Sequence, residues 1–391
     1  MPKGECMTEK AAIELMDAFA ERTGLNSAAE PRRYLWTDAF AVINFLELHR
    51  RTKDERYRAL GVALIEQVHA VLGRHRADDP RIGWLSGLPE DNGESRPTAG
   101  GLRIGKTLPE RRPDDPPDER LEWERDGQYF HYLTKWMDAL SRASTLVRES
   151  KYHRQAAELA KAVFPRFLQR SPSGAPLGLA WKMSIDLSRP QVSGISPHDA
   201  LDGYATFKWL DAGAAGEASL SEETEVLRSL VKYWDWDTTD SLGLGGLLLD
   251  ALRLAILADR SDSDEKLLGR ILSSVAGGLD GFMQEGALKQ PPTRRLGFRE
   301  LGLSIGLQGM DLISAAAEKS AGLAAVSGRY IRALRTASAI GAQIVEFWSE
   351  HRHRQSPTWQ DHRDINEVML ATAMLKAHVG TAVIQKDTNG A

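Results

Sequence analysis

Residues 240–257 read DSLGLGGLLLDALRLAIL, a stretch of helical length that is apolar almost all the way round. A helix without a polar side must be buried on every side. Five further stretches are of the same kind, namely 34–48, 126–140, 199–212, 297–316 and 364–378. The chain is therefore predicted to contain six fully enclosed helices.

Amphipathic segments alternate with the enclosed ones. Residues 54–72 place Tyr57, Leu60, Leu64 and Val68 on one helical face, a spacing typical of a helix with one solvated side. Segments 8–22, 151–168, 220–234, 263–284 and 328–348 show similar spacing. We predict an all-α fold, an (α/α)6 toroid in which six helical hairpins form one domain over residues 1–391. A curved open solenoid is the alternative.

Two segments interrupt the helical pattern. Residues 75–125 are rich in Pro, Gly and charge, and so long a loop in a compact domain usually has a function. Residues 176–190 alternate enough to predict a short β-hairpin. Because both precede inner helices, we expect both at the active-site end of the toroid. Simple surface elaboration is the alternative.

Composition argues against several classes of function. The net charge of −4 gives no reason to expect a nucleic-acid partner, and no apolar run is long enough to predict a membrane partner. The single cysteine, Cys6, and an N-terminal stretch without an apolar core favour a cytoplasmic location. We predict neither a metal nor a cofactor, and the sequence leaves the oligomeric state open.

Most of the enclosed helices begin with polar or aromatic side chains. In an alternating toroid all inner helices point the same way, so these side chains would meet at one mouth. They are Trp36, Asp38, Asp126, Gln128, His198, Asp199, Asp202, Glu300, Trp359, His362, Arg363 and Asp364. Helix capping is the alternative explanation for each acid, because Asp is favoured at helix starts.

A local echo singles out two of these acids. The pentad KWMDA at 135–139 matches KWLDA at 208–212, and their alignment places Asp126 on Asp199. Chance or a packing requirement would also produce this match. Glycoside hydrolysis needs two carboxyl groups flanking the scissile bond. We predict a carbohydrate substrate, with Asp126 as general acid, Asp199 as its partner and all the other polar and aromatic residues named above as binding groups.

The chain resembles the six-hairpin glycosidase superfamily over nearly its whole length. The residues that carry the resemblance are LWTDAF (35–40), DGQYFHYLTKWMDAL (126–140), HDALDG (198–203) and WQDHRDINEVM (359–369). In that superfamily, unsaturated-uronyl hydrolases and their relatives use aspartates on successive inner helices. By resemblance, Asp126 and Asp199 would fill those places.

Two other functions stay open. The N-acylglucosamine 2-epimerase group is similar to the same toroid and uses histidines for proton transfer. By that resemblance, His131, His198 and His362 would serve in a sugar isomerase or epimerase. A non-catalytic helical scaffold is the third interpretation, since toroids have unrelated functions.

Overall fold

The computed structural model describes residues 3–213, 219–232, 234–257 and 260–379. These residues are mostly helical, with four short strands among them. By its contacts the chain groups into two compact units. One unit is Ala20–Tyr233, and the other is discontinuous, combining Met1–Phe19 with Trp234–Ala391. A single domain over the whole chain stays a prediction.

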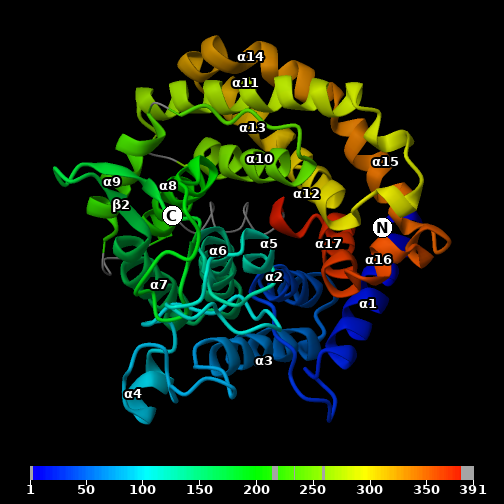
Figure 1. Cartoon of the computed structure of the whole chain (residues 1–391). Helices are drawn as coiled ribbons and strands as arrows, with labels where there is room; N and C mark the ends of the chain where they lie inside the picture. The colour runs from blue at the N-terminus through cyan, green and yellow to red at the C-terminus, as the bar shows by residue number, and fades with distance from the viewer. Residues whose placement is uncertain (1–2, 214–218, 233, 258–259, 380–391) are drawn as a thin grey trace. The chain divides into compact units, whose positions relative to one another are not determined.

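Three helical hairpins form the unit of residues 20–233 (Figure 1). They are α2 (Leu35–Thr52) with α3 (Glu55–Leu72), α6 (Phe130–Val147) with α7 (Ser150–Phe167), and α8 (Pro197–Gly213) with α9 (Ser221–Val231). The first helices of the hairpins pack in the order α2, α6, α8. Every residue of α2 from Leu35 to Leu48 is buried, whereas α3, α7 and α9 bury one face. This alternation is the one that the sequence predicts.

The discontinuous unit contains α1 (Lys3–Arg22) up to Phe19 and the helices that follow residue 234. Its first pair is α10 (Ser241–Ile256) with α11 (Asp262–Gln284), and α10 also packs on α12 (Gly297–Leu307). The remaining helices are α13 (Met310–Glu318), α14 (Ala321–Thr336), α15 (Ser338–Ser349), α16 (Pro357–Gln360) and α17 (Arg363–Leu375). Helix α12 contacts both α15 and α17, so it lies inside this unit.

Glycines allow α10 and α12 to approach each other closely. A Cβ atom on Gly245 would lie 2.2 Å from the carbonyl oxygen of Gly302. A Cβ atom on Gly306 would lie 2.7 Å from the carbonyl oxygen of Gly245. Only a residue without a side chain fits such a backbone contact, which explains the glycine-rich sequence of these enclosed helices.

Two predicted helices are each divided in the structure. Segment 297–316 forms α12 and α13, which are separated at Gln308–Gly309, and segment 328–348 spans α14 and α15, which are separated at Ala337. Glycine is a poor helix former, which weakens the first segment at Gly309. Near the second break, the Thr336 hydroxyl donates to the Arg332 carbonyl at 3.1 Å. Such side-chain bonds to the preceding turn bend helices.

The β-hairpin predicted within 176–190 forms in its second half, where Met183 and Pro190 pair in an antiparallel bridge and the Ser184 N–H donates to the Arg189 carbonyl at 2.9 Å. The other pairings were not predicted: β3 (Pro176–Leu179) pairs with β2 (Leu168–Arg170), and β4 (Lys182–Met183) pairs with β1 (Gln128–Tyr129), both antiparallel. Residue alternation indicates strands but does not reveal their partners. The pairing of β1 with β4 joins the end of the long segment before α6 to the chain that follows β3.

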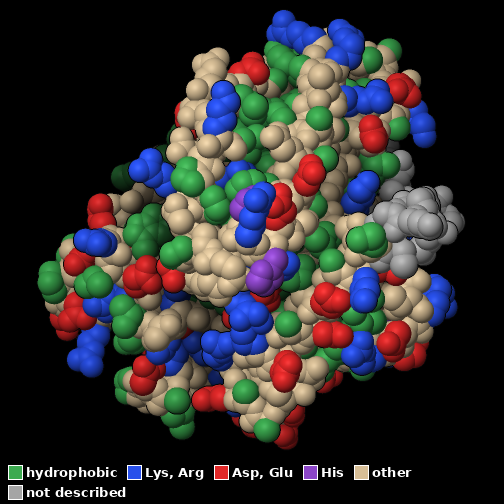
Figure 2. Space-filling model, turned by 90° about the vertical axis from the view of Figure 1, so that its right-hand side faces the viewer, with side chains coloured by type: hydrophobic (Ala, Val, Ile, Leu, Met, Phe, Trp, Pro, Cys, Tyr) green, Lys and Arg blue, Asp and Glu red, His purple; other side chains and the backbone are tan. Residues whose placement is uncertain are grey.

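Charged side chains of both signs cover the surface. On the face drawn in Figure 2, acidic and basic residues are interspersed, in keeping with the small net charge of the sequence. None of the helices in the described ranges combines the length and the apolar character that crossing a membrane requires. The cytoplasmic location stays a prediction.

Candidate active site

The first turns of α2, α6 and α8 bring a histidine, an aspartate and a tryptophan together. Nδ1 of His131, near the start of α6, lies 3.4 Å from the Asp199 carboxylate near the start of α8. The Trp36 ring at the start of α2 lies 6.2 Å from the His131 ring, centroid to centroid. Three enclosed helices of one unit therefore bring a tryptophan ring, an imidazole and a carboxylate together at their first turns.

Aromatic side chains extend from this contact in a series that we call the aromatic row: Trp123, Trp181, Tyr129, His131 and Tyr132. Tyr129 stacks on His131 with centroids 5.3 Å apart, and Tyr132 meets His131 edge-on at 4.9 Å. Trp181 lies 5.4 Å from Tyr129, and Trp123 lies 4.1 Å from Trp181. Trp123 is 53% exposed. The row thus runs from an exposed tryptophan to the histidine, and such ring faces suit sugar rings.

The hydroxyl groups of Tyr34 and Tyr129 stay protonated at neutral pH. Burial, opposed by a hydrogen bond between its hydroxyl and that of Tyr132, raises the pKa of Tyr34 to about 12. Burial likewise raises the pKa of Tyr129. The negative charge of Glu124, an exposed residue of the loop before β1, adds to both shifts. The Glu124 carboxylate therefore interacts electrostatically with Tyr34 and Tyr129.

A buried ion pair fixes the spacing of α6 and α8 one turn beyond His131 and Asp199. Lys135 Nζ lies 2.7 Å from a carboxylate oxygen of Asp202, and the Thr134 hydroxyl donates to the same oxygen. Both charged side chains are almost fully buried. The Asp202 carboxylate therefore links α6 to α8. The ion pair keeps the first turns of these helices, which carry His131 and Asp199, at a fixed spacing.

Asp126 lies in the loop before β1 and is fully buried. One carboxylate oxygen accepts from the Arg103 guanidinium at 2.6 Å and from Arg76 at 3.4 Å. The other accepts from the backbone N–H groups of Gly105 and Gly127, both at 3.0 Å. These bonds hold the long segment 75–125 against the residues that lead into β1. They do not favour proton transfer to a substrate, and the role of Asp126 as general acid stays a prediction.

Gln128 and Asp38 also hold backbone in place. The fully buried Gln128 amide accepts from the Leu102 N–H at 3.0 Å and donates to the Ile185 carbonyl at 2.7 Å. The Asp38 carboxylate accepts from the Tyr34 N–H at 2.8 Å at the start of α2. Both residues thus support the segments around the cluster.

The start of α8 is capped by a serine. The Ser196 hydroxyl accepts from the Asp199 N–H at 3.3 Å, which leaves the Asp199 carboxylate directed to His131. His198 is partly exposed beside it. The first turn of α8 therefore combines a capped backbone with an aspartate whose side chain is only 5% exposed.

Two of the predicted site residues in the other unit lie in its packed interior. The Glu300 carboxylate contacts the Arg295 guanidinium at 2.6 Å and accepts from Trp348 Nε1 at 2.8 Å. The Trp359 ring stacks on Trp348 with centroids 5.1 Å apart. These contacts join α12, α15 and α16.

The remaining predicted residues lie at the start of α17. His362 and Arg363 are exposed, and Asp364 is partly exposed. Arg363 Nε donates to the Glu367 carboxylate at 2.8 Å, and the His362 ring meets Phe298 edge-on at 5.5 Å. Their binding roles stay predictions.

The matching pentads do not occupy equivalent positions. Lys135 lies in the second turn of α6, whereas Lys208 lies in the fourth turn of α8. As a result Asp126 falls in a loop and Asp199 falls within a helix. The echo therefore does not reflect a structural repeat around these two acids.

Five residues around this site were not predicted from the sequence, namely Tyr34, Tyr129, Tyr132, Lys135 and Glu124. A usable signal was present for two of them, because YFHY at 129–132 places tyrosines beside a histidine at the start of an otherwise enclosed helix. For Glu124 no local signal sets it apart from neighbouring acids. Within the described ranges, no group of three or more His, Cys, Asp or Glu side chains could hold a metal ion.

Comparison with known proteins gives a likeness in fold. No family model matches the chain, and no curated protein matches its sequence. The structure is similar to that of a family 76 glycoside hydrolase from a bovine Bacteroides thetaiotaomicron strain, with a TM-score of 0.54 and 11% identity over 96% of this chain and 77% of that chain. This likeness confirms the predicted fold class, all-α with the hairpins of an (α/α)6 toroid.

Proposed function

We propose that the protein is a glycoside hydrolase whose chemistry is centred on Asp199 and His131. The observation that carries the proposal is the contact of these two residues beside the aromatic row, where three enclosed helices begin. The shared fold of a structure described as a glycoside hydrolase supports it, although one fold can have many functions. The substrate class is a carbohydrate that stacks on the aromatic row.

Glycoside hydrolysis requires a second carboxyl group. The sequence predicts Asp126, whose oxygens accept from Arg103, Arg76 and backbone N–H groups. Accessibility favours Glu124, which is exposed and whose carboxylate has no hydrogen bond or ion pair to another described residue. Its charge contributes to the raised pKa of Tyr34 and of Tyr129, and the charge of Asp126 contributes to that of Tyr34. We propose Glu124 as the partner of Asp199, because a general acid must reach the leaving oxygen.

Three variants test these assignments on a panel of aryl glycosides that includes unsaturated uronides. Asp199→Asn and Glu124→Gln should each lower kcat/KM by about 100- to 10,000-fold, with melting temperatures unchanged. Asp126→Asn should lower the melting temperature, because it removes the buried charge that pairs with Arg103. Loss of turnover in Asp126→Asn at unchanged stability would instead support the sequence prediction. Full activity of Asp199→Asn would refute the proposal.

A sugar isomerase or epimerase is the second candidate. The same contact favours it, since a partly exposed histidine paired with an aspartate suits proton transfer at carbon. Incubation of candidate sugars in deuterated water separates the two functions. Isomerisation would exchange a carbon-bound proton, whereas hydrolysis would release a reducing end without exchange at carbon.

A further inference from the structure

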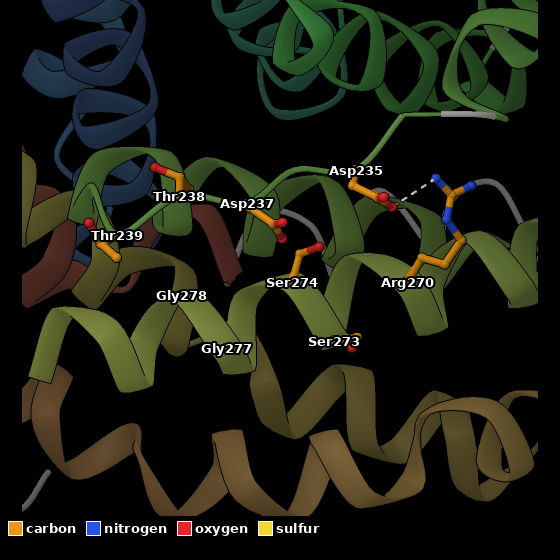
Figure 3. Close-up of a pocket in the computed structure, with 9 residues that line it drawn as sticks. All are labelled: Asp235, Asp237, Thr238, Thr239, Arg270, Ser273, Ser274, Gly277 and Gly278. Carbon is orange, nitrogen blue, oxygen red and sulfur yellow. Dashed lines mark ion pairs between the residues drawn. The ribbon is translucent and has the colours of Figure 1, made fainter. Parts of the chain in front are cut away.

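A polar hollow lies between α11 and the segment that leads into α10, within the discontinuous unit (Figure 3). Its volume of about 610 Å³ falls in the range of small-molecule sites. Its lining includes Asp235, Asp237, Arg270, Ser274, Gly277 and Gly278. None of them belongs to the unit that contains the candidate active site.

Adjacent glycines of α11 shape the hollow in opposite ways. A Cβ atom on Gly278 would lie 2.1 Å from the carbonyl oxygen of Thr238, so this glycine lets the segment before α10 approach the helix. A Cβ atom on Gly277 would meet no atom within 4 Å. Gly277 therefore opens onto space and leaves room beside the serines of the same helix.

One cation of the hollow is held in place. Arg270 donates to the backbone carbonyl of Trp234, and its guanidinium lies 3.6 Å from the Asp235 carboxylate. The guanidinium carbon lies 5.1 Å from the centroid of the Trp236 ring. These contacts from one short segment fix the orientation of Arg270, so little ordering is needed before a ligand binds.

Two other polar groups are available to a ligand. Figure 3 shows Asp237 and Ser274 directed toward one another across the hollow, from the segment and from α11. Among the described residues, neither side chain has a hydrogen-bond or ion-pair partner. The hollow thus presents a carboxylate acceptor and a hydroxyl that acts as donor or acceptor.

The charged side chains of the hollow favour a neutral ligand over an anion. Two carboxylates and one arginine oppose an anion, while adjacent hydroxyl groups of a sugar match a carboxylate and a serine hydroxyl. Trp234, next to Asp235, is 37% exposed and offers an apolar surface at the same segment. We propose that this hollow is a binding site for a neutral carbohydrate, separate from the candidate active site.

Native mass spectrometry of the full chain tests the proposal by counting bound oligosaccharides. The probes are cellohexaose, maltohexaose, mannohexaose and xylohexaose, added to the Asp199→Asn variant so that none is consumed. Introducing Gly277→Gln should lower the count by one for the probe that binds, because the new side chain projects into the space that Gly277 leaves open. Asp237→Ala should weaken the same binding event about tenfold or more.

Two controls distinguish a loss of the binding site from a loss of the fold. Gly277→Gln replaces a poor helix former with a good one, so its melting temperature should not fall. Asp280→Ala changes an exposed acid on the same helix outside the hollow and should leave the count unchanged. The proposal is overturned if no probe binds or if Gly277→Gln binds as many as its parent. Hydrolysis of aryl glycosides by Gly277→Gln alone should be normal, so failure of the glycosidase proposal is observed separately.

Discussion

His69 is a histidine that its surroundings keep neutral. Trp136 Nε1 donates to His69 Nε2 at 3.2 Å, and burial lowers the pKa of His69 from 6.5 to about 3. In the unfolded chain this histidine binds a proton near pH 6.5. Between pH 6.5 and 3 the unfolded state therefore binds more protons, and the free energy of unfolding falls as the pH falls, by up to about 1.4 kcal/mol per pH unit.

Replacement of His69 tests this linkage. His69→Gln keeps an acceptor for Trp136 but does not titrate, so its free energy of unfolding should change less between pH 6.5 and 4.5 than that of the parent. Urea denaturation at several pH values measures the difference. His351→Gln, at an exposed histidine, should keep the parental pH dependence. Parallel curves for His69→Gln and the parent would contradict the assignment.

Asp126 and Asp199 show how far single residues can be predicted. Both precede the same pentad motif by the same spacing, and the sequence gives no reason to separate them. Their surroundings differ, because Asp126 pairs with Arg103 of the long segment and Asp199 contacts His131 of the neighbouring helix. Such partners depend on which turns of two helices face each other, and sequence periodicity does not specify that register.

Helices were predicted more reliably than the breaks and strand pairs within them. Periodicity located the enclosed and amphipathic segments, because burial of one face or of all faces leaves a pattern in the sequence. The break at Ala337 and the pairing of β1 with β4 depend on hydrogen bonds to particular neighbours. Hydrogen bonds of this kind produce no periodic pattern in the sequence.

The close approach of α10 and α12 leads to a prediction about packing. Gly245→Ala places a Cβ atom against the carbonyl of Gly302 and should lower the free energy of unfolding by about 1–3 kcal/mol, as overpacking does. Gly246→Ala, one residue further along α10, meets nothing within 4 Å. It should be neutral or stabilising by up to about 1 kcal/mol. Chemical denaturation of the pair measures the contrast, and equal effects would argue against the contact.

At the scale of the whole molecule, the fold class was predictable because fully buried and half-buried helices alternate along most of the described residues. The grouping into two units was not, since α1 joins residues that follow Trp234. Met16 and Phe19 of α1 are almost fully buried, yet their sequence does not reveal what covers them. Long-range contacts of this kind require the fold itself.

Deletion of residues 1–19 should act unevenly on the molecule. It removes the buried side chains of Met16 and Phe19 from the discontinuous unit, and burial of each such side chain contributes about 1.5–3 kcal/mol. Hydrogen exchange should therefore quicken more in residues 234–379 than in residues 35–213. Equal loss of protection in both ranges would show that α1 stabilises the two units alike.

The discontinuous unit is completed late during synthesis, because its two parts lie far apart in the sequence. α1 leaves the ribosome before the rest of its unit, because the 214 residues of 20–233 lie between Phe19 and Trp234. At about 5–20 residues per second, α1 waits on the order of 10–40 s for these partners. All of residues 20–233 emerge in that interval and can fold as a contiguous unit. During that time α1, an amphipathic helix, lacks the rest of its unit, so the side chains of Met16 and Phe19 that are buried in the folded chain wait for residues beyond Trp234.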